Sequence, residues 1–303
     1  GLHCNIRKLR KKVFTLPELI ANNTISVQAA AFIILCMTLR LNITICGEPS
    51  SGKTTLANAI NMTAPSFWRQ IAIEDALESI SVSQWGRHHV TFKVDPFDSI
   101  EEKRYTKSNE IIRLLHRSPD WVFLGEIQTE EHSAAMFHAL SAGIRGIQTC
   151  HANSNDDLLL RWRIHHKIPA VCFKNLGLLV HMVRDISFNR TIRKIAQISE
   201  VDTQSEELQL RSLYEWDRDS KQLVRLHEKP LTPLITSACK YTLVTLTEAQ
   251  KRYQAYKELL EHLCREREYD PSAIMDAFNQ VHCKLLSKPS LREEPLVISS
   301  SGG

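Results

Sequence analysis

Short apolar runs alternate with amphipathic segments along most of the chain. Four of these runs stop at a glycine or at polar residues, with LNITIC before Gly47, QIAI before Glu74, WVFL before Gly125 and GIQTC before His151. Runs of this length that contain branched residues are typical of buried parallel strands. A fifth run of this kind, LGLLVHMV, occupies residues 176–183.

The segments between these runs predict helices that connect the strands. Residues 54–61 follow the first strand, Ser108 can cap a helix that Pro119 stops, and Thr129 can cap a helix that ends at Gly143. Strands that alternate with helices predict an α/β fold, with a mainly parallel sheet and helices on both of its faces.

The longest apolar run is VQAAAFIILCMTL at residues 27–39, and Arg40 closes it. It is shorter than the roughly 20 residues that a membrane-spanning helix needs. We therefore expect a buried core helix here, capped by a residue in 22–24, that leads into the first strand.

The last third of the chain has a different pattern. LQLRSLYEWDRDSKQLVRL predicts two strands around a turn at residues 217–220. Two helices follow: Thr247 and Gln250 have the spacing of a capping box, and Asp270 followed by Pro271 is typical of a helix start.

Composition and charge limit the function only weakly. The 303 residues are 43% hydrophobic and 24% charged, which is an ordinary globular composition, and the net charge of +4 permits an acidic partner without demanding one. The eight cysteines form no C-x-x-C pair, which fits a reducing cytosol better than a disulfide framework.

The stretch ITICGEPSSGKTT gives the first chemical signal. It has the spacing G-x-x-x-x-G-K-T between a predicted strand and a predicted helix, which is the context of a phosphate-binding P-loop. The backbone N–H groups of such a loop and the start of its helix bind phosphate, its lysine reaches the β- and γ-phosphates, and its threonine ligates Mg²⁺. The predicted nucleotide-binding residues are Gly47, Ser50, Ser51, Gly52, Lys53, Thr54 and Thr55, with ATP and Mg²⁺ as cofactors.

Acidic residues at two other predicted strand ends extend this site. Glu126 in LGEIQ is a candidate to orient and deprotonate a water that attacks the γ-phosphate, although a capping or ion-paired glutamate is the structural alternative. Glu74, Asp75 and Glu78 in IEDALE can supply metal-linked acids, with Glu74 and Asp75 as ligands beside Thr54 and Glu78 as a catalytic acid. A solvated acidic loop is the alternative for at least one of the three.

GIQTCHAN places Thr149 and His151 at a further strand end. A histidine there can donate a hydrogen bond to the γ-phosphate, whether it is neutral or charged. A lone histidine is more often structural, so His151 becomes a catalytic candidate only through its company with Lys53 and Glu126.

The four motifs, in the order GEPSSGKTT, IEDALE, PDWVFLGEIQ and GIQTCHANS, resemble those of the type II/type IV secretion ATPase superfamily. The lead-in to the P-loop and the helical end RYQAYKELLEHLCREREYD look like the archaeal branch that drives archaella and type IV pili. The resemblance covers most of residues 10–285 and implies a RecA-like P-loop NTPase fold with a small helix-rich C-terminal appendage. We expect a linker or remnant of a missing N-terminal domain at 1–25, the ATPase core at 26–190, a hairpin and helical region at 191–290 and a disordered tail at 291–303.

Some positions depart from the family pattern. His116 and Ser118 stand where the family often has arginines before the third strand, Gln128 replaces the arginine of G-E-I-R, and Ile144 replaces a histidine. Arg117, next to His116 and Ser118, and Arg145, next to Ile144, are candidates to compensate. Arg87 and Arg104 are the candidate arginine fingers for a neighbouring subunit, with solvated surface arginines as the alternative.

The resemblance implies a Mg²⁺-dependent ATP-hydrolysing motor for an archaeal type IV pilus-like or archaellum filament, or for a secretion complex. The implied partners are further copies of the chain in a hexameric ring, a polytopic membrane platform protein and an acidic lipid surface, with no specific nucleic acid. The implied location is the cytoplasm, at the inner face of the membrane. Two alternatives stay open: a catalytically weakened paralogue that acts as a scaffold, and a nucleic-acid-stimulated ATPase.

Overall fold

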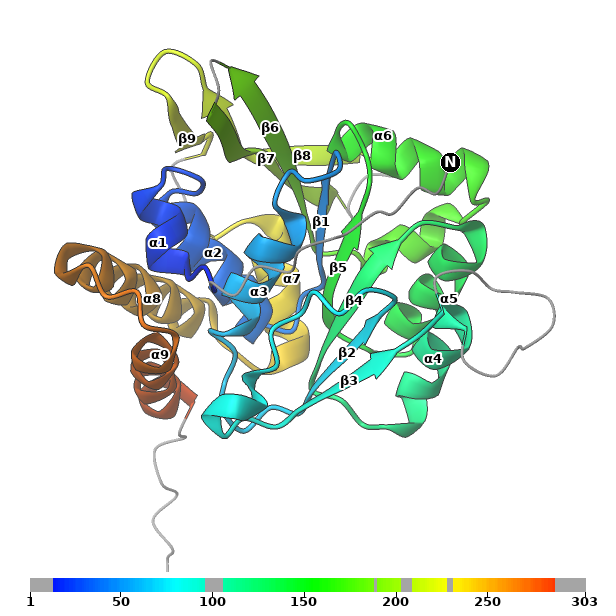
Figure 1. Ribbon diagram of the computed structural model, residues 1–303, viewed down its shortest axis with the longest axis horizontal. Coiled ribbons are helices and arrows are strands. Elements are labelled where there is room, and N and C mark those ends of the chain that lie inside the picture. The colour runs from blue at the N-terminus through cyan, green and yellow to red at the C-terminus, as the bar shows by residue number, and fades with distance from the viewer. Residues whose placement is uncertain (1–12, 96–105, 188–189, 203–208, 228–230, 287–303) are drawn as a thin grey trace, which may run out of the picture.

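A single sheet organises the molecule. The computed structural model describes residues 13–95, 106–187, 190–202, 209–227 and 231–286. Within them, nine strands pair in the order β3-β2-β4-β5-β1-β6-β7-β8-β9 (Figure 1). The strands are β1 (Ile43–Gly47), β2 (Gln70–Glu74), β3 (His89–Lys93), β4 (Trp121–Ile127), β5 (Gly146–Cys150), β6 (Leu178–Ser187), β7 (Arg190–Asp202), β8 (Gln209–Asp217) and β9 (Gln222–Arg225).

The sheet has a parallel part and an antiparallel part. All the pairings from β3 to β6 are parallel, and those of β6 with β7, β7 with β8 and β8 with β9 are antiparallel. The five strands predicted from the apolar runs are confirmed, as are β8 and β9, whose turn is closed by the Asp217 carboxylate accepting from the backbone N–H groups of Asp219 and Ser220. Strands β3 and β7 were not predicted from the sequence.

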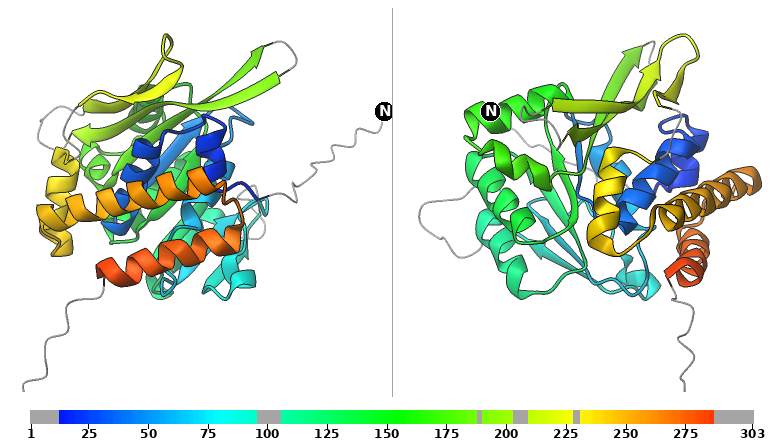
Figure 2. Two further views of the ribbon diagram at one scale, coloured as in Figure 1. Left: turned by 90° about the vertical axis from the view of Figure 1, so that its left-hand side faces the viewer. Right: turned by 180° about the vertical axis from the view of Figure 1, so that it is seen from behind.

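Helices cover both faces of the sheet, as predicted (Figures 1 and 2). One apolar cluster lies between the sheet and α2, α3, α7 and α8, and a second lies between the sheet and α4, α5 and α6. The helices are α1 (Leu16–Ala21), α2 (Val27–Thr38), α3 (Lys53–Asn61), α4 (Lys107–Arg113), α5 (Glu130–Ser141), α6 (Asn155–Leu160), α7 (Pro233–Thr242), α8 (Leu246–Glu266) and α9 (Pro271–Leu286).

The apolar run at 27–39 forms helix α2, which is buried on every side. Residues 29–37 have no exposed surface, because α2 lies between the sheet and α8. Its cap is Ser26, whose hydroxyl accepts from the N–H of Ala29 at 3.4 Å, so the cap predicted in 22–24 is wrong. None of the helices in the described ranges combines the length and hydropathy that a bilayer crossing requires.

Two other helix starts were predicted a few residues late. Helix α4 is capped by Thr106 rather than Ser108, and α8 by Thr245 rather than Thr247. In α8 the Thr245 hydroxyl accepts from the N–H of Glu248 at 3.1 Å, and the Glu248 carboxylate accepts from the N–H of Thr245 at 2.8 Å. A glutamate therefore completes the capping box that the prediction gave to Gln250. The cap of α9 at Asp270 is confirmed.

The sheet continues through the boundary that was predicted at residue 190. Strands β6 and β7 pair on either side of it, from Leu178 with Glu200 to Ser187 with Arg190. Part of the predicted linker at 1–25 also forms helix α1, whose Leu16 and Leu19 are buried in the same cluster as α2. Residues 1–12 and the predicted disordered tail at 291–303 lie outside the described residues.

Buried hydrogen bonds attach the C-terminal helices to the segment that follows α3. His282 on α9 is fully buried; its Nε2 donates to the carbonyl oxygen of Thr63 at 2.7 Å, and its Nδ1 lies 3.2 Å from the Tyr256 hydroxyl on α8. Burial lowers the pKa of His282 to about 4, so this imidazole is neutral in the folded protein at neutral pH.

This network predicts a specific dependence of stability on pH. The unfolded chain binds a proton at His282 below its ordinary pKa of about 6.5, and the folded protein does so only near 4, so acidification through this window favours unfolding. Wild-type protein should lose about 3 kcal/mol more unfolding free energy between pH 7 and pH 4 than His282→Gln. Denaturant unfolding at several pH values measures the difference, and parallel curves for the two proteins would contradict it.

Candidate functional site

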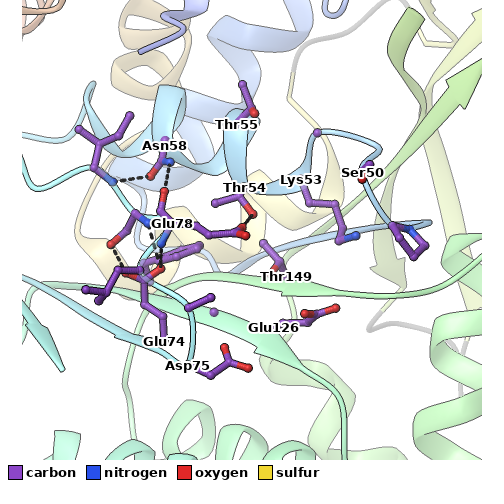
Figure 3. A pocket seen from close by; sticks show the side chains of 18 of the residues that line it. Ser50, Lys53, Thr54, Thr55, Asn58, Glu74, Asp75, Glu78, Glu126 and Thr149 are labelled. Atoms are coloured by element: carbon purple, nitrogen blue, oxygen red, sulfur yellow. Dashed lines mark hydrogen bonds between the residues drawn. The ribbon is translucent and has the colours of Figure 1, made fainter. Parts of the chain in front are cut away.

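The four motifs meet at one edge of the sheet because their strands are neighbours. Strands β2, β4, β5 and β1 are adjacent in that order and parallel, so their carboxyl ends lie side by side. Ligands of open α/β sheets bind at this edge. A cavity of about 660 Å³ opens there (Figure 3), lined by Phe14, Pro49, Ser50, Gly52, Lys53, Thr54, Thr55, Asn58, Glu74, Asp75, Ala76, Leu77, Glu78, Ser79, Ile80, Phe123, Gly125, Glu126, Thr149, His151 and Arg193.

The loop between β1 and α3 is shaped by close backbone approaches. A Cβ at Gly47 would lie 2.3 Å from the carbonyl oxygen of Met182 on β6, so a side chain cannot fit there. Gly52, the N-cap of α3, has a φ of +99°, and Ser50 has a φ of +62°. The carbonyl oxygen of Ser50 accepts from the Arg193 guanidinium on β7 at 2.8 Å, so the sheet extension helps to hold this strained loop.

Lys53 lies under this loop and is 7% exposed. Its Nζ donates to the carbonyl oxygens of Gly47 and Glu48, each at 3.0 Å, and lies 3.2 Å from Nδ1 of His151. Burial lowers the pKa of Lys53, while the charge of Glu126 opposes that effect. The predicted encounter of the P-loop lysine with the residues at 126 and 151 is therefore present in the fold.

His151 connects Lys53 to Glu126. The Nε2 of its ring contacts the Glu126 carboxylate, and its Nδ1 lies 3.2 Å from the carbonyl oxygen of Gly47. Both side chains are about one-third exposed at the cavity, at 36% and 28%. The start of α3, the residue after β5 and strand β4 thus contribute an amine, an imidazole and a carboxylate to one group.

A bulge in β4 sets the position of Glu126. The β4–β5 register shifts between Leu124 and Ile127, so that β4 has one residue more than its partner strand. Gly125 makes this possible, since a Cβ there would lie 3.1 Å from the Cβ of Glu74. The bulge directs the Glu126 side chain toward Lys53 and the cavity (Figure 3).

The acids after β2 have distinct partners. The Glu74 carboxylate is buried and accepts from the N–H groups of Glu78 and Ser79 and from the Ser79 hydroxyl, and burial raises its pKa. Glu78 accepts from the Thr54 hydroxyl at 2.8 Å. Asn58 on α3 donates to the Glu78 carbonyl oxygen at 2.9 Å and accepts from the N–H of Ile80 at 3.1 Å. These two hydrogen bonds hold the loop after β2 against α3.

Lys107 and Arg193 were missed by the sequence analysis. The buried Nζ of Lys107, on α4, donates to the Asp75 carboxylate at 3.1 Å and to the carbonyl oxygen of Glu126 at 2.8 Å. Neither residue belongs to a motif of known spacing, so no sequence signal distinguishes them from other basic residues. Of the predicted nucleotide-binding residues, Gly47 and Ser51 lie behind the cavity wall and the other five line it.

Three of the arginines singled out in the sequence are described by the structure, and Arg87, Arg117 and Arg145 do not line the cavity. The Arg87 guanidinium donates to the carbonyl oxygen of Met275 and pairs with Asp276 on α9, and Arg104 lies outside the described residues. Arg117 pairs with Glu110 and stacks over Phe92.

The predicted compensation by neighbouring arginines is not seen at the cavity. Arg145 donates to the carbonyl oxygens of Leu140 and Ile144, so its guanidinium is bonded to the local backbone between α5 and β5. The four departures from the family pattern also lie off the cavity lining: His116, Ser118, Gln128 and Ile144.

The sequence match decides the family. A family described as type II/IV secretion system protein matches residues 1–210. The chain belongs to this family. The match contains all four strand ends and every described residue that lines the cavity.

Several curated relatives are similar to the chain. An uncharacterized protein of Methanocaldococcus jannaschii is 23% identical over 271 residues, covering 83% of this chain and 97% of the relative. A putative conjugal transfer protein of Mycobacterium tuberculosis is 27% identical over 217 residues, covering 67% and 59%. The type IV secretion system protein PtlH of Bordetella pertussis is 29% identical over 149 residues, covering 48% and 43%. The chain thus spans about half of the two named relatives' lengths.

Solved structures of secretion and pilus ATPases are also similar to parts of the chain. The VirB11 ATPase of the Brucella suis type IV secretion system has a TM-score of 0.47 and 23% identity, over 56% of this chain and 51% of that one. The pilus retraction motor PilT with bound ADP has a TM-score of 0.43 and 15% identity, over 81% and 68%. The family assignment therefore rests on the sequence match.

The Asn58 contacts predict that this residue controls the acidic loop. Asn58→Ala removes both hydrogen bonds and should lower the free energy of unfolding by about 2 kcal/mol. Hydrogen exchange of the Ile80 amide should become faster in this variant. Asn58→Asp is the matched control, because it keeps the acceptor for that amide, and its Ile80 protection should survive. Equal exchange in Asn58→Ala and wild type would contradict the assignment.

Proposed function

We propose that the chain is an ATP-hydrolysing motor subunit that powers assembly of a type IV pilus-like or archaellum filament, or of a secretion complex. The observation that carries this proposal is the group formed by Lys53, His151 and Glu126 beside the Thr54–Glu78 contact. A lysine, a hydroxyl and a carboxylate around the N-terminus of α3 are the parts that phosphoryl transfer to water requires.

A second cavity, next to the first, is the proposed binding site of the nucleotide base. About 300 Å³ in volume, it shares Phe14, Gly52, Thr55 and Arg193 with the first cavity. Its other lining residues are mostly apolar and include Leu19, Leu56, Met182 and Ile192. In this arrangement the phosphates bind at the start of α3, and the base is covered by the apolar residues between α1 and β7.

The donors near Thr54 fit a magnesium ion. Mg²⁺ prefers oxygen ligands and takes few of them from the protein, the rest being phosphate and water. The Thr54 hydroxyl and the Glu78 carboxylate are adjacent and line the cavity, whereas the Glu74 carboxylate is engaged by its own loop. Thr54, with Glu78 behind it, would hold the ion, which when bound offsets phosphate charge.

The catalytic roles follow from these positions. Glu126 accepts a proton from the attacking water, which its place at the cavity edge allows. His151 holds the Glu126 carboxylate through its contact and senses the same phosphate that Lys53 binds. Lys53 leaves its carbonyl acceptors for the β- and γ-phosphate oxygens.

The cellular setting is proposed from the family and its relatives. We place the protein in a hexameric ring at the cytoplasmic face of the membrane, against a polytopic platform protein and acidic lipid. The relatives from Methanocaldococcus jannaschii support an archaeal branch, and the secretion and conjugal-transfer names of the bacterial relatives support a transport machine.

Substitution of the proposed base tests the activity. Glu126→Gln should lower ATP turnover by about 100-fold or more while nucleotide binding persists, because only the proton acceptor is lost. Lys53→Ala should instead abolish nucleotide binding. Glu130→Gln, which changes an exposed acid on α5, is the matched control and should turn over like wild type. Phosphate release and binding of a fluorescent ATP analogue measure the two effects.

Two outcomes would replace the motor by the alternatives. A wild-type protein that binds ATP without hydrolysis, in the presence of acidic lipid and at concentrations that allow assembly, would favour the scaffold. Turnover that rises with DNA and not with acidic lipid would favour the nucleic-acid-stimulated ATPase.

The proposed metal site makes a separate prediction. Thr54→Ala should raise the Mg²⁺ concentration that gives half-maximal ATP binding by about tenfold, because about 1.4 kcal/mol of ligation is lost. Thr54→Ser keeps the hydroxyl and should stay within about twofold of wild type. A magnesium titration of nucleotide binding measures this, and identical midpoints for Thr54→Ala and wild type would remove Thr54 from the site.

A further inference from the structure

Lys107 is a buried lysine behind the acidic side of the cavity. Its side chain is 1% exposed, and it is the first residue of α4, after the N-cap Thr106. A buried ammonium is costly unless it is paired and hydrogen-bonded. The fold meets this cost with two acceptors, the Asp75 carboxylate and the carbonyl oxygen of Glu126.

The carbonyl oxygen of Glu126 belongs to the bulged part of β4. A bulge leaves its extra residue outside the regular ladder, and the register with β5 is broken between Leu124 and Ile127. The Lys107 amine is 2.8 Å from this oxygen, so it supplies a hydrogen bond at the irregular position. The Glu126 side chain contacts the imidazole of His151. Lys107 therefore holds the backbone of Glu126, the residue whose carboxylate lines the cavity.

Asp75 is the countercharge of this lysine. Its carboxylate is 19% exposed and lies 3.1 Å from the Lys107 amine, at the end of the strand next to β4. In Figure 3 the Asp75 and Glu126 side chains are drawn below the Thr54–Glu78 pair. The cations that line the cavity from the phosphate-loop side are Lys53 and Arg193, so Lys107 balances the acids from behind.

We propose that Lys107 is a positioning residue that fixes the Glu126 carboxylate through its main chain, with Asp75 as the countercharge of the lysine and not as a metal ligand. This proposal rests on the hydrolytic function proposed above. Lys107 belongs to none of the four motifs. Under this proposal the residues that would hold Mg²⁺ are Thr54 and Glu78.

The kinetic test uses Lys107→Met, which keeps the length and removes the charge. It should lower kcat by about tenfold to a hundredfold with KM within about twofold of wild type, because binding is intact and only the base is displaced. Lys107→Arg keeps the charge and should recover part of the loss. Lys93→Met, the same change at the exposed end of β3, is the matched control and should keep wild-type kcat. An unchanged kcat in Lys107→Met would overturn the positioning role.

The metal arm uses Asp75→Asn in the magnesium titration of nucleotide binding. The midpoint should stay within about twofold of wild type, in contrast to the tenfold shift expected for Thr54→Ala. A shift for Asp75→Asn as large as that for Thr54→Ala would return Asp75 to the metal site and overturn this half of the proposal.

A structural arm separates failure of this inference from failure of the proposed function. Lys107→Met leaves a carboxylate unpaired and should lower the midpoint of thermal unfolding by several degrees, and Lys107→Met with Asp75→Asn should recover part of it. Hydrogen exchange at the Glu126 and Ile127 amides should be faster in Lys107→Met. Absence of ATP turnover in the wild-type protein would overturn the proposed function and leave the exchange result to be interpreted by itself. Unchanged exchange at these two amides in Lys107→Met would overturn the anchoring of Glu126 by Lys107.

Discussion

Parallel pairing of β4, β5 and β1 is the constraint on which the site depends. Ile43 pairs with Ile147 and Phe123 pairs with the same residue from the other side, which places the ends of the three strands at one level. Side chains alternate between the two faces of a strand, so a slip of one residue would turn His151 away from Lys53. The interior of the sheet is fully buried on both sides, and this burial enforces the register.

Each of the four carboxylates at the site has a partner, and for three of them the partner belongs to another element. Glu74 is held by the loop that follows it, Glu78 by α3, Asp75 by α4 and Glu126 by β5. Four carboxylates can lie near one cavity because each has a donor of its own, and a hydrogen bond to a carboxylate stabilises its charged form. The arrangement also explains why the loop after β2 needs support from Asn58 on a different element.

The sequence predicted the parts of the fold whose signal is local. Buried parallel strands have continuous apolar runs, and the P-loop and the Thr129 and Asp270 caps have fixed spacings, so these features were found. Strand β3 was missed because its residues are only half buried and carry a mixed pattern, and β7 because it pairs antiparallel and alternates in character. Lys107 could not be found, since its role arises from a bulge on a strand that is distant in sequence.

The uninterrupted sheet limits how the molecule can deform. Strand β6 pairs with β1 on one side and with β7 on the other. Backbone hydrogen bonds therefore connect the antiparallel strands to β1, the strand that precedes the phosphate loop. The Arg193–Ser50 contact adds a second tie between them. Strands β6 to β9 and the loop before α3 are therefore expected to move together as one rigid unit.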